Sequence, residues 1–149
     1  GPGDNYDLES SHVIPALLRK AVAARDAGDA NMMVWGTGTP RREFMHVDDL
    51  ADALVFVLKN YSQAAHINVG SGSDVTIAEL AATVADVVGF KGGLAFDTSR
   101  PDGTPRKLMD GAKLAAMGWS PRIGLREGLA DAYAHLQRDM AARSGAARA

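Results

Sequence analysis

The sequence predicts an α/β fold, and three observations support that class. In several segments apolar residues recur at three- and four-residue spacing, which is typical of amphipathic helices. Shorter apolar runs that end at glycine or proline lie between those segments and have the length of buried strands. Helical and extended segments therefore alternate, as they do when helices cover a sheet. Only three or four short strands are expected, too few for a complete doubly wound sheet.

The first half of the chain is expected to contain two helices. Ser10 or Ser11 can cap the first helix, whose apolar residues run from Val13 to Val22 and which should end near Gly28. Two aspartates fall in the first turn of the second helix, where the helix dipole favours negative charge. The elements after the first helix are a strand over Met32–Trp35, a short extended stretch over Arg42–Met45 and the second helix over Val47–Leu58.

The second half is expected to contain two strands and three helices. Thr76 and Glu79 have the spacing of a capping box, which predicts the start of a helix over Ile77–Val88. Residues 100–105 hold two prolines and a glycine and predict a turn-rich loop. The remaining elements are strands over His66–Val69 and Leu94–Phe96, helices over Gly111–Met117 and Leu125–Arg143, and a flexible tail over 144–149.

Composition excludes several classes of function. The chain has 149 residues, of which 46% are hydrophobic and 23% charged, values typical of a globular domain. Its formal charge of −2 comes from interspersed acidic and basic residues, so neither nucleic acid nor an anionic membrane is an expected partner. The absence of cysteine excludes disulfides, thiolate metal sites and a cysteine nucleophile in this chain. Without an apolar run of ~20 residues or a leader-like start, the sequence favours a cytoplasmic protein.

Two glycine pairs invite comparison with a dinucleotide-binding loop, but neither completes it. The G-x-G-x-x-G pattern needs a third glycine. That position holds Arg41 after the pair Gly36 and Gly38, and Val75 after the pair Gly70 and Gly72. Both pairs are therefore interpreted as turns. The Tyr-x-x-x-Lys pair of short-chain dehydrogenases is also absent, so this chain is not expected to perform that chemistry alone. Four residues after Tyr6, Tyr61 and Tyr133 stand Ser10, Ala65 and Gln137.

Four segments together resemble the C-terminal half of the GDP-L-fucose synthase family, a group of extended short-chain dehydrogenases. They are GPGDNYDLESSHVIPALLRK, VWGTGTPRREFMHVDDLADA, INVGSGSDVTIAELA and FDTSRPDGTPRKLMD. The most specific parts are SHVIPALLRK and PDGTPRK. The resemblance implies that residues 1–143 are the nucleotide-sugar-binding part of such an enzyme, with a few elements that complete a Rossmann domain encoded upstream.

The resemblance also implies an activity. Members of this family epimerise GDP-4-keto-6-deoxy-D-mannose at two carbons that flank its ketone, and then reduce the ketone with NADPH to give GDP-L-fucose. Their N-terminal half carries the glycine-rich NADP loop, the Ser/Tyr/Lys set and a cysteine acid/base. Because the sequence opens inside a Gly/Pro turn, we expect a fragment of such an enzyme. That fragment should be inactive alone and bind NADP(H) poorly, and its parent is expected to be a homodimer.

Three residues carry the expected chemistry. His12 resembles the family's histidine acid/base, a role that needs a group able to exchange protons near neutral pH. Arg42 resembles the arginine that binds the GDP diphosphate, for which a guanidinium fork is well suited, and Lys107 resembles a lysine that contacts the nucleotide. The other residues that resemble ligand contacts are Lys20 and Asp102, the apolar Val13, Leu17, Val34 and Trp35 of a guanine and ribose pocket, and Asn5 on the cofactor side.

Plainer interpretations of these residues stay open. His12 can be a helix cap, Arg42 a surface arginine paired with an acidic neighbour, and the apolar residues part of the core. Two other functions also remain: a different extended short-chain dehydrogenase that acts on a UDP- or dTDP-sugar, or a non-catalytic module that binds a sugar nucleotide. The spacing of His46, His66 and His135 indicates no metal site.

The helix over Val47–Leu58 predicts a property of the isolated chain. If this helix and the strand over His66–Val69 normally pack on the missing half, their apolar faces are uncovered here. The chain should then associate with itself or be partly disordered.

Overall fold

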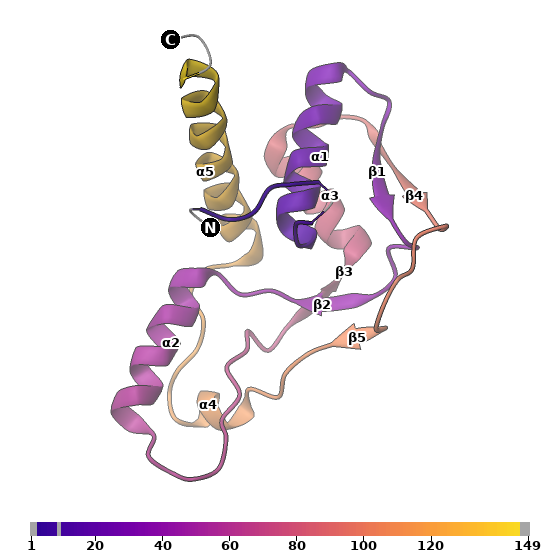
Figure 1. The fold of residues 1–149 in the computed structure, drawn as a ribbon. Coiled ribbons are helices and arrows are strands. Elements are labelled where there is room, and N and C mark those ends of the chain that lie inside the picture. The colour runs from indigo at the N-terminus through magenta and orange to yellow at the C-terminus, as the bar shows by residue number, and fades with distance from the viewer. Residues whose placement is uncertain (1–2, 9, 147–149) are drawn as a thin grey trace.

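The computed structural model describes residues 3–8 and 10–146, and within them it has a mixed α/β fold (Figure 1). The α/β prediction is therefore confirmed. The elements in chain order are α1 (Val13–Ala27), β1 (Asn31–Trp35), β2 (Arg41–Glu43), α2 (Val47–Asn60), β3 (Asp74–Thr76), α3 (Ile77–Val88), β4 (Gly93–Asp97), β5 (Arg106–Lys107), α4 (Ala112–Ala116) and α5 (Leu125–Ala146).

The main core lies between helices α1, α3 and α5 and the parallel pair β1–β4. Strand β1 alternates, so that Met32 and Val34 are buried while Met33 and Trp35 are exposed on the other face. Helix α1 buries Leu17 and the neighbouring apolar residues of its predicted stripe against this core. The largest fully buried side chains there are Leu18, Met32, Leu80, Leu129, Leu136, Val34 and Val84.

A second sheet has the order β3-β2-β5. Strand β2 runs antiparallel to β3 and parallel to β5. In the β2–β5 register Arg41 faces Arg106, and Arg42 faces Lys107. This small sheet consequently places two of the predicted ligand-binding cations on neighbouring strands.

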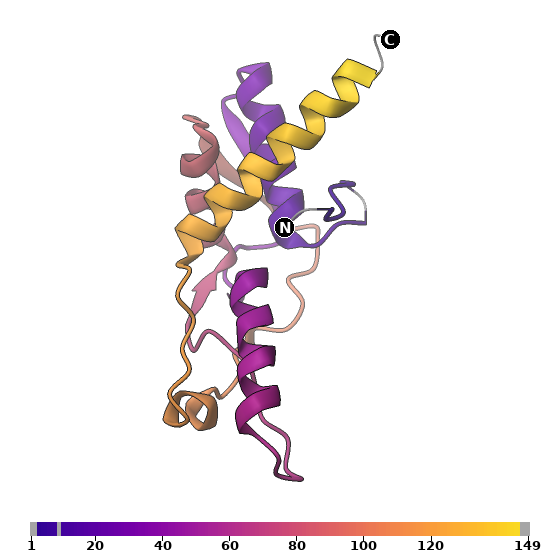
Figure 2. The same cartoon turned by 90° about the vertical axis from the view of Figure 1, so that its left-hand side faces the viewer.

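Helices α2 and α4 form a smaller unit at one end of the molecule, away from α1, α3 and the β1–β4 pair, as both views show (Figures 1 and 2). Its buried residues are Ala53, Leu114 and Trp119. The carboxylate of Asp49 is 2% exposed and accepts hydrogen bonds from the backbone N–H groups of Arg122 and Ile123, at 3.1 and 2.9 Å. These bonds offset the cost of burying the carboxylate and join α2 to the segment before α5.

Two sequence expectations about the elements need correction. The strand over His66–Val69 was wrong: this segment pairs with no strand in the described part of the chain, and the Asn68 side chain instead donates to the carbonyl of Asp110 at 3.1 Å. An apolar run becomes a strand only where a partner edge is available. Helix α5 continues to Ala146, past its expected end at Arg143. The rest of the tail, 147–149, lies outside the described residues.

Within the described part of the chain, no helix combines the length and the apolar character needed to cross a bilayer.

Candidate functional site

An exposed aromatic ring lies at the carboxyl end of the parallel pair β1–β4. Trp35 ends β1 and stands in register with Asp97, which ends β4. The Trp35 residue is 41% exposed, with Lys20 Nζ 4.2 Å and Arg100 Cζ 4.6 Å from the ring centroid. Both cations are within the distance at which the ring quadrupole attracts positive charge. In open α/β sheets, this end of the strands is where ligands bind.

The turn that follows Asp97 is built by its own carboxylate. Oδ1 accepts hydrogen bonds from the Ser99 hydroxyl at 2.6 Å and from the Ser99 backbone N–H at 3.1 Å. Oδ2 lies 3.9 Å from Nε of Arg100. The Ser99 bonds, helped by the charges of Arg100 and Lys20, hold the pKa of Asp97 below its ordinary value. Asp97 thus carries negative charge beside the two cations at the Trp35 ring.

The loop over 98–105 is fastened to the segment after β1. Thr37 donates to Asp102 twice, from its backbone N–H at 2.7 Å and from its hydroxyl at 2.8 Å. This contact requires glycine at position 36, because a Cβ there would collide with the Asp102 carboxylate and the backbone φ is +81°. Both oxygens of Asp102 are therefore engaged with Thr37, which makes this side chain a positioning group for the loop.

Arg42 and Lys107 lie side by side where β2 and β5 pair. Arg42 donates from Nη1 to the carbonyl of Arg41 at 2.8 Å. A Cβ placed on Gly103 would lie 3.7 Å from Arg42 Nη2, so the loop over 98–105 reaches from the Trp35 ring to this pair. Lys107 is exposed. The two cations can together meet an anionic group, with the arginine able to bind it through two donors.

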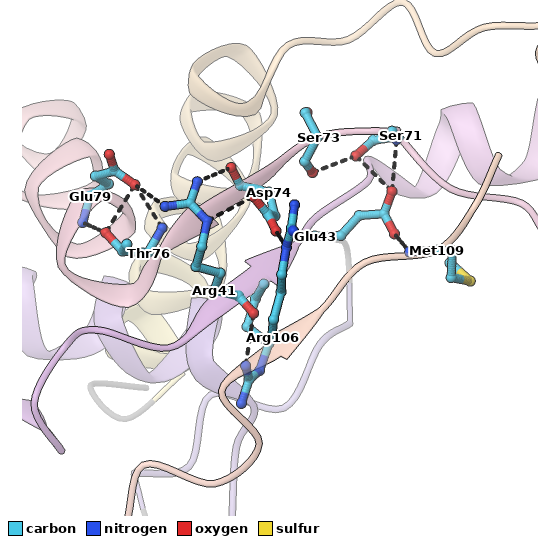
Figure 3. A network of polar contacts seen from close by, with 11 residues as sticks. Arg41, Glu43, Ser71, Ser73, Asp74, Thr76, Glu79, Arg106 and Met109 are labelled. Carbon is cyan, nitrogen blue, oxygen red and sulfur yellow. Dashed lines mark hydrogen bonds and ion pairs between the residues drawn. The ribbon is translucent and has the colours of Figure 1, made fainter. Parts of the chain in front are cut away.

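Asp74 ties together the three strands beneath this pair (Figure 3). It accepts from Nε of Arg41 at 2.8 Å and from Nε of Arg106 at 2.5 Å, and its side chain is only 5% exposed. The hydrogen bonds from Arg106 and Arg41 lower the pKa of Asp74. Because each strand contributes one member, the network fixes the register that sets Arg42 beside Lys107.

Glu43, the last residue of β2, joins two other segments of the chain through its carboxylate (Figure 3). Its carboxylate accepts from the backbone N–H of Gly72 at 2.8 Å, from the Ser71 hydroxyl at 3.2 Å and from the backbone N–H of Met109 at 3.0 Å. The glycine pair at 70 and 72 thus folds around a carboxylate of the chain itself, in agreement with the prediction of a turn.

His12 and Asn5 lie in the segment that leads into α1. His12 is exposed at the N-cap position of the helix, and its side chain makes no capping hydrogen bond. The capping interpretation of the imidazole is therefore wrong. Asn5 accepts from the backbone N–H of Asp7 at 3.0 Å and donates to the Ser10 hydroxyl at 3.1 Å, so it shapes this segment.

The chain is similar in sequence and in fold to proteins of one family. The model of the NAD dependent epimerase/dehydratase family matches residues 1–70. GDP-L-fucose synthase 1 of Arabidopsis thaliana is 57% identical over 133 residues, and the GDP-L-fucose synthase of Escherichia coli is 49% identical over 142 residues. The chain is a homologue of the GDP-L-fucose synthases, within the NAD dependent epimerase/dehydratase family.

This GDP-L-fucose synthase homologue spans less than half the length of the relatives it matches. Each of the two matches covers 89% of this chain, but 41% of the Arabidopsis protein and 44% of the Escherichia coli protein. A crystal structure of a GDP-L-fucose synthetase from Naegleria fowleri bound to NADP superposes with a TM-score of 0.86 at 27% identity, over 94% of this chain and 44% of that one. The fold therefore matches part of an extended short-chain dehydrogenase.

Not all of the apolar residues expected in a ligand pocket share one surface of this homologue. Leu17 and Val34 are 3% and 1% exposed and belong to the main core, and Val13 packs against that core while partly buried. Val34 and Trp35 are neighbours on β1, so they point to opposite faces of the pair. Of these four residues, Trp35 has by far the largest exposed surface available to a ligand, and Leu17 and Val34 can act only by supporting it.

The structure also adds residues and hollows that the sequence interpretation missed. Arg100, Asp97 and Thr37 join the predicted set through their contacts with Trp35 and Asp102. The Asp-x-Ser pattern after an apolar strand is a signal for the turn at Asp97. A hollow of about 560 Å³ lies elsewhere, and nothing in the sequence pointed to it; its lining includes Gly70, Met109, Leu114 and Trp119. Among the described residues no cluster of His, Cys, Asp or Glu could hold a metal ion.

Proposed function

We propose that this chain is the nucleotide-sugar-binding, C-terminal part of a GDP-L-fucose synthase. The whole enzyme would epimerise GDP-4-keto-6-deoxy-D-mannose and reduce it with NADPH to GDP-L-fucose. The observation that carries the proposal is the arrangement of Trp35, Arg42 and Lys107 along one loop in a homologue of these enzymes. An exposed ring and a pair of cations at the two ends of one loop have the chemistry needed to bind a nucleoside diphosphate.

Each part of the ligand has a matching group. The guanine and ribose pack against the part of the Trp35 ring that Lys20 and Arg100 leave exposed, which is a flat apolar surface. The diphosphate lies at Arg42 and Lys107, where the arginine can donate two parallel hydrogen bonds. Lys20 adds positive charge over the face of the ring, with Nζ 4.2 Å from its centroid. Asp102 acts through Thr37 to hold the loop in place.

His12 is proposed as one of two groups that exchange protons with the sugar carbons beside the ketone. Its exposed imidazole, with no role in capping α1, is accessible to a ligand. The second group would come from outside this chain.

The glycine pairs of this chain do not fit NADPH. A Cβ on Gly38 would collide with the Phe96 ring and one on Gly36 with Asp102, so that turn is already filled. The turn at Gly70 and Gly72 encloses the Glu43 carboxylate, which would repel a phosphate. We therefore assign NADPH binding to a part of the longer enzyme outside these 149 residues, with Asn5 at most shaping the segment that faces it. We also propose that the whole enzyme is a homodimer.

Calorimetric titration with GDP tests the proposal. The chain should bind GDP, and Trp35→Ala should weaken binding at least about fivefold through loss of stacking. Arg42→Ala should weaken it about tenfold because hydrogen bonds to a charged group are lost. Met33→Ala, on the same exposed face of β1, and Arg138→Ala, on α5, are the matched controls and should leave affinity unchanged.

The same titration with UDP and dTDP separates the alternatives. Tighter binding of UDP or dTDP than of GDP would reassign the chain to another extended short-chain dehydrogenase. Absence of GDP binding, in a chain shown to be folded by circular dichroism, would refute the proposal. Full epimerase and reductase activity of the 149-residue chain alone would contradict the assignment of NADPH binding to another part of the enzyme.

A further inference from the structure

Arg100 is held at the Trp35 ring by a cation–π contact and a long ion pair, and neither uses the hydrogen-bond donors of its guanidinium. Its side chain is 54% exposed, and its ion pair with Asp97 spans 3.9 Å. Exposed pairs of this kind contribute ~0–1 kcal/mol, which is comparable to the entropy lost in ordering a long side chain. Within the described part of the chain, the Arg100 guanidinium donates no hydrogen bond to another residue, although it has five donors.

The backbone nonetheless fixes the position of Arg100 from both sides. On one side, Asp97 closes the turn through two hydrogen bonds from Ser99, and the Arg100 backbone N–H donates to the Asp97 carbonyl at 3.2 Å. On the other side, the Asp102 carboxylate is held by Thr37. Arg100 is therefore presented on an anchored loop, which limits the entropy that a ligand contact would cost.

The charges along this loop favour an anion. Lys20 and Arg100 lie at the ring, and Arg42 and Lys107 lie where the loop returns to the sheet. The nearby carboxylates of Asp97 and Asp102, which accept hydrogen bonds from Ser99 and Thr37, offset only part of this positive charge. Four cations thus lie along this loop, in a chain whose formal charge is −2.

We propose that Arg100 is a further phosphate-binding residue, which rests on the Trp35 ring and donates hydrogen bonds to the diphosphate of the bound nucleotide. Arg42 and Lys107 would meet the same diphosphate from β2 and β5. This inference rests on the proposed binding of a nucleoside diphosphate and names one more residue of that site. Stacking on the ring leaves the edge of a guanidinium, where its N–H donors point, open to phosphate oxygens.

Comparison of GDP with guanosine tests this role in the 149-residue chain. Arg100→Gln removes the charge but keeps a planar polar group, and it should weaken GDP binding about tenfold while changing guanosine binding less than about twofold. Arg100→Lys keeps the charge without the fork and should lose less. Raising the salt concentration should weaken GDP binding less in Arg100→Gln than in the original chain, because one charge contact fewer is screened.

The controls make every outcome decisive. Arg138→Gln, an exposed arginine on α5, should leave both affinities unchanged. An equal loss for GDP and guanosine in Arg100→Gln would show that Arg100 only supports Trp35, and a gain for guanosine would show that it obstructs the ring. Either result overturns the inference. The inference alone fails if the original chain binds GDP, Arg42→Ala weakens that binding, and Arg100→Gln binds GDP as tightly as the original chain does. If the original chain binds no GDP, both the inference and the proposed function fail.

Discussion

At the scale of single residues, carboxylates organise the candidate site by fixing the segments around it. The Asp74, Asp97 and Asp102 carboxylates each accept two hydrogen bonds from neighbouring groups, and each fixes a segment that carries a cation or ring of the proposed binding site. Such groups hold flexible arginines and lysines in usable positions before a ligand arrives.

Asp74 gives the site a predictable pH dependence. Its pKa is lowered in the folded state by hydrogen bonds from Arg106 and Arg41. Its contribution to stability is therefore fully present above the ordinary carboxylate pKa and is lost as the pH falls through the lowered value. Urea denaturation of Asp74→Asn should show reduced stability at pH 7 and a smaller further loss on acidification than the original chain.

The matched control is Asp29→Asn, which alters an exposed aspartate in the turn after α1. It should keep the original pH profile. Identical profiles for Asp74→Asn and the original chain would contradict the assigned role of the Arg41–Asp74–Arg106 network.

At the scale of elements, the capping box at the start of α3 links the second sheet to the main core. The Glu79 backbone N–H donates to the Thr76 hydroxyl at 3.0 Å, and the Thr76 backbone N–H donates to the Glu79 carboxylate at 2.7 Å. Thr76 is also the last residue of β3, paired with Arg41. One residue thus closes a strand and opens a helix.

Thr76→Ala should lower the free energy of unfolding by about 1 kcal/mol through loss of this cap. Thr83→Ala, within the same helix, is the control, because alanine is the better helix former and the change should be neutral or slightly stabilising. Thermal unfolding of both variants measures the difference. A larger loss from Thr83→Ala would show that the cap is not the dominant contribution.

The elements also show what the sequence could and could not predict. Helices α1, α3 and α5 and strand β1 were predictable because their apolar spacing and terminal residues are local signals. Strands β3 and β5 were missed because they are short and polar and exist only through pairing with β2. The same limit applies to the site: Arg42 and Lys107 were predicted individually from a family resemblance, whereas Arg100 at the Trp35 ring depends on a loop geometry that spacing does not reveal.

At the scale of the whole molecule, five of the exposed large apolar residues in the described part of the chain lie on α2. Val47, Leu50, Leu54 and Leu58 recur along one side of the helix and are 40% to 83% exposed. Val55 is exposed beside them. Apolar surface of this kind costs roughly 25 cal/mol for each Å² kept in water. The uncovered face expected from the sequence is therefore present, and its consequence for association remains a prediction.

We expect the chain to self-associate as its concentration rises, and the double change Leu54→Lys and Leu58→Lys to reduce that association. Sedimentation velocity over a range of concentrations measures it. Leu8→Lys, at an exposed leucine outside α2, serves as the control and should leave association unchanged. A single monomeric species at all concentrations would contradict the prediction, as would equal behaviour of the two variants.

The parallel pairing of β2 with β5 has one more consequence. Arg42 and Lys107 are distant in sequence and become neighbours only when these two strands meet. Short peptides that contain either residue should therefore lack affinity for diphosphates. A protease cut between the strands should abolish diphosphate binding if the cut releases β5 from the sheet. Binding of a diphosphate can then report that β2 and β5 have paired. A ligand that bridges the two strands should also slow their separation under mechanical force.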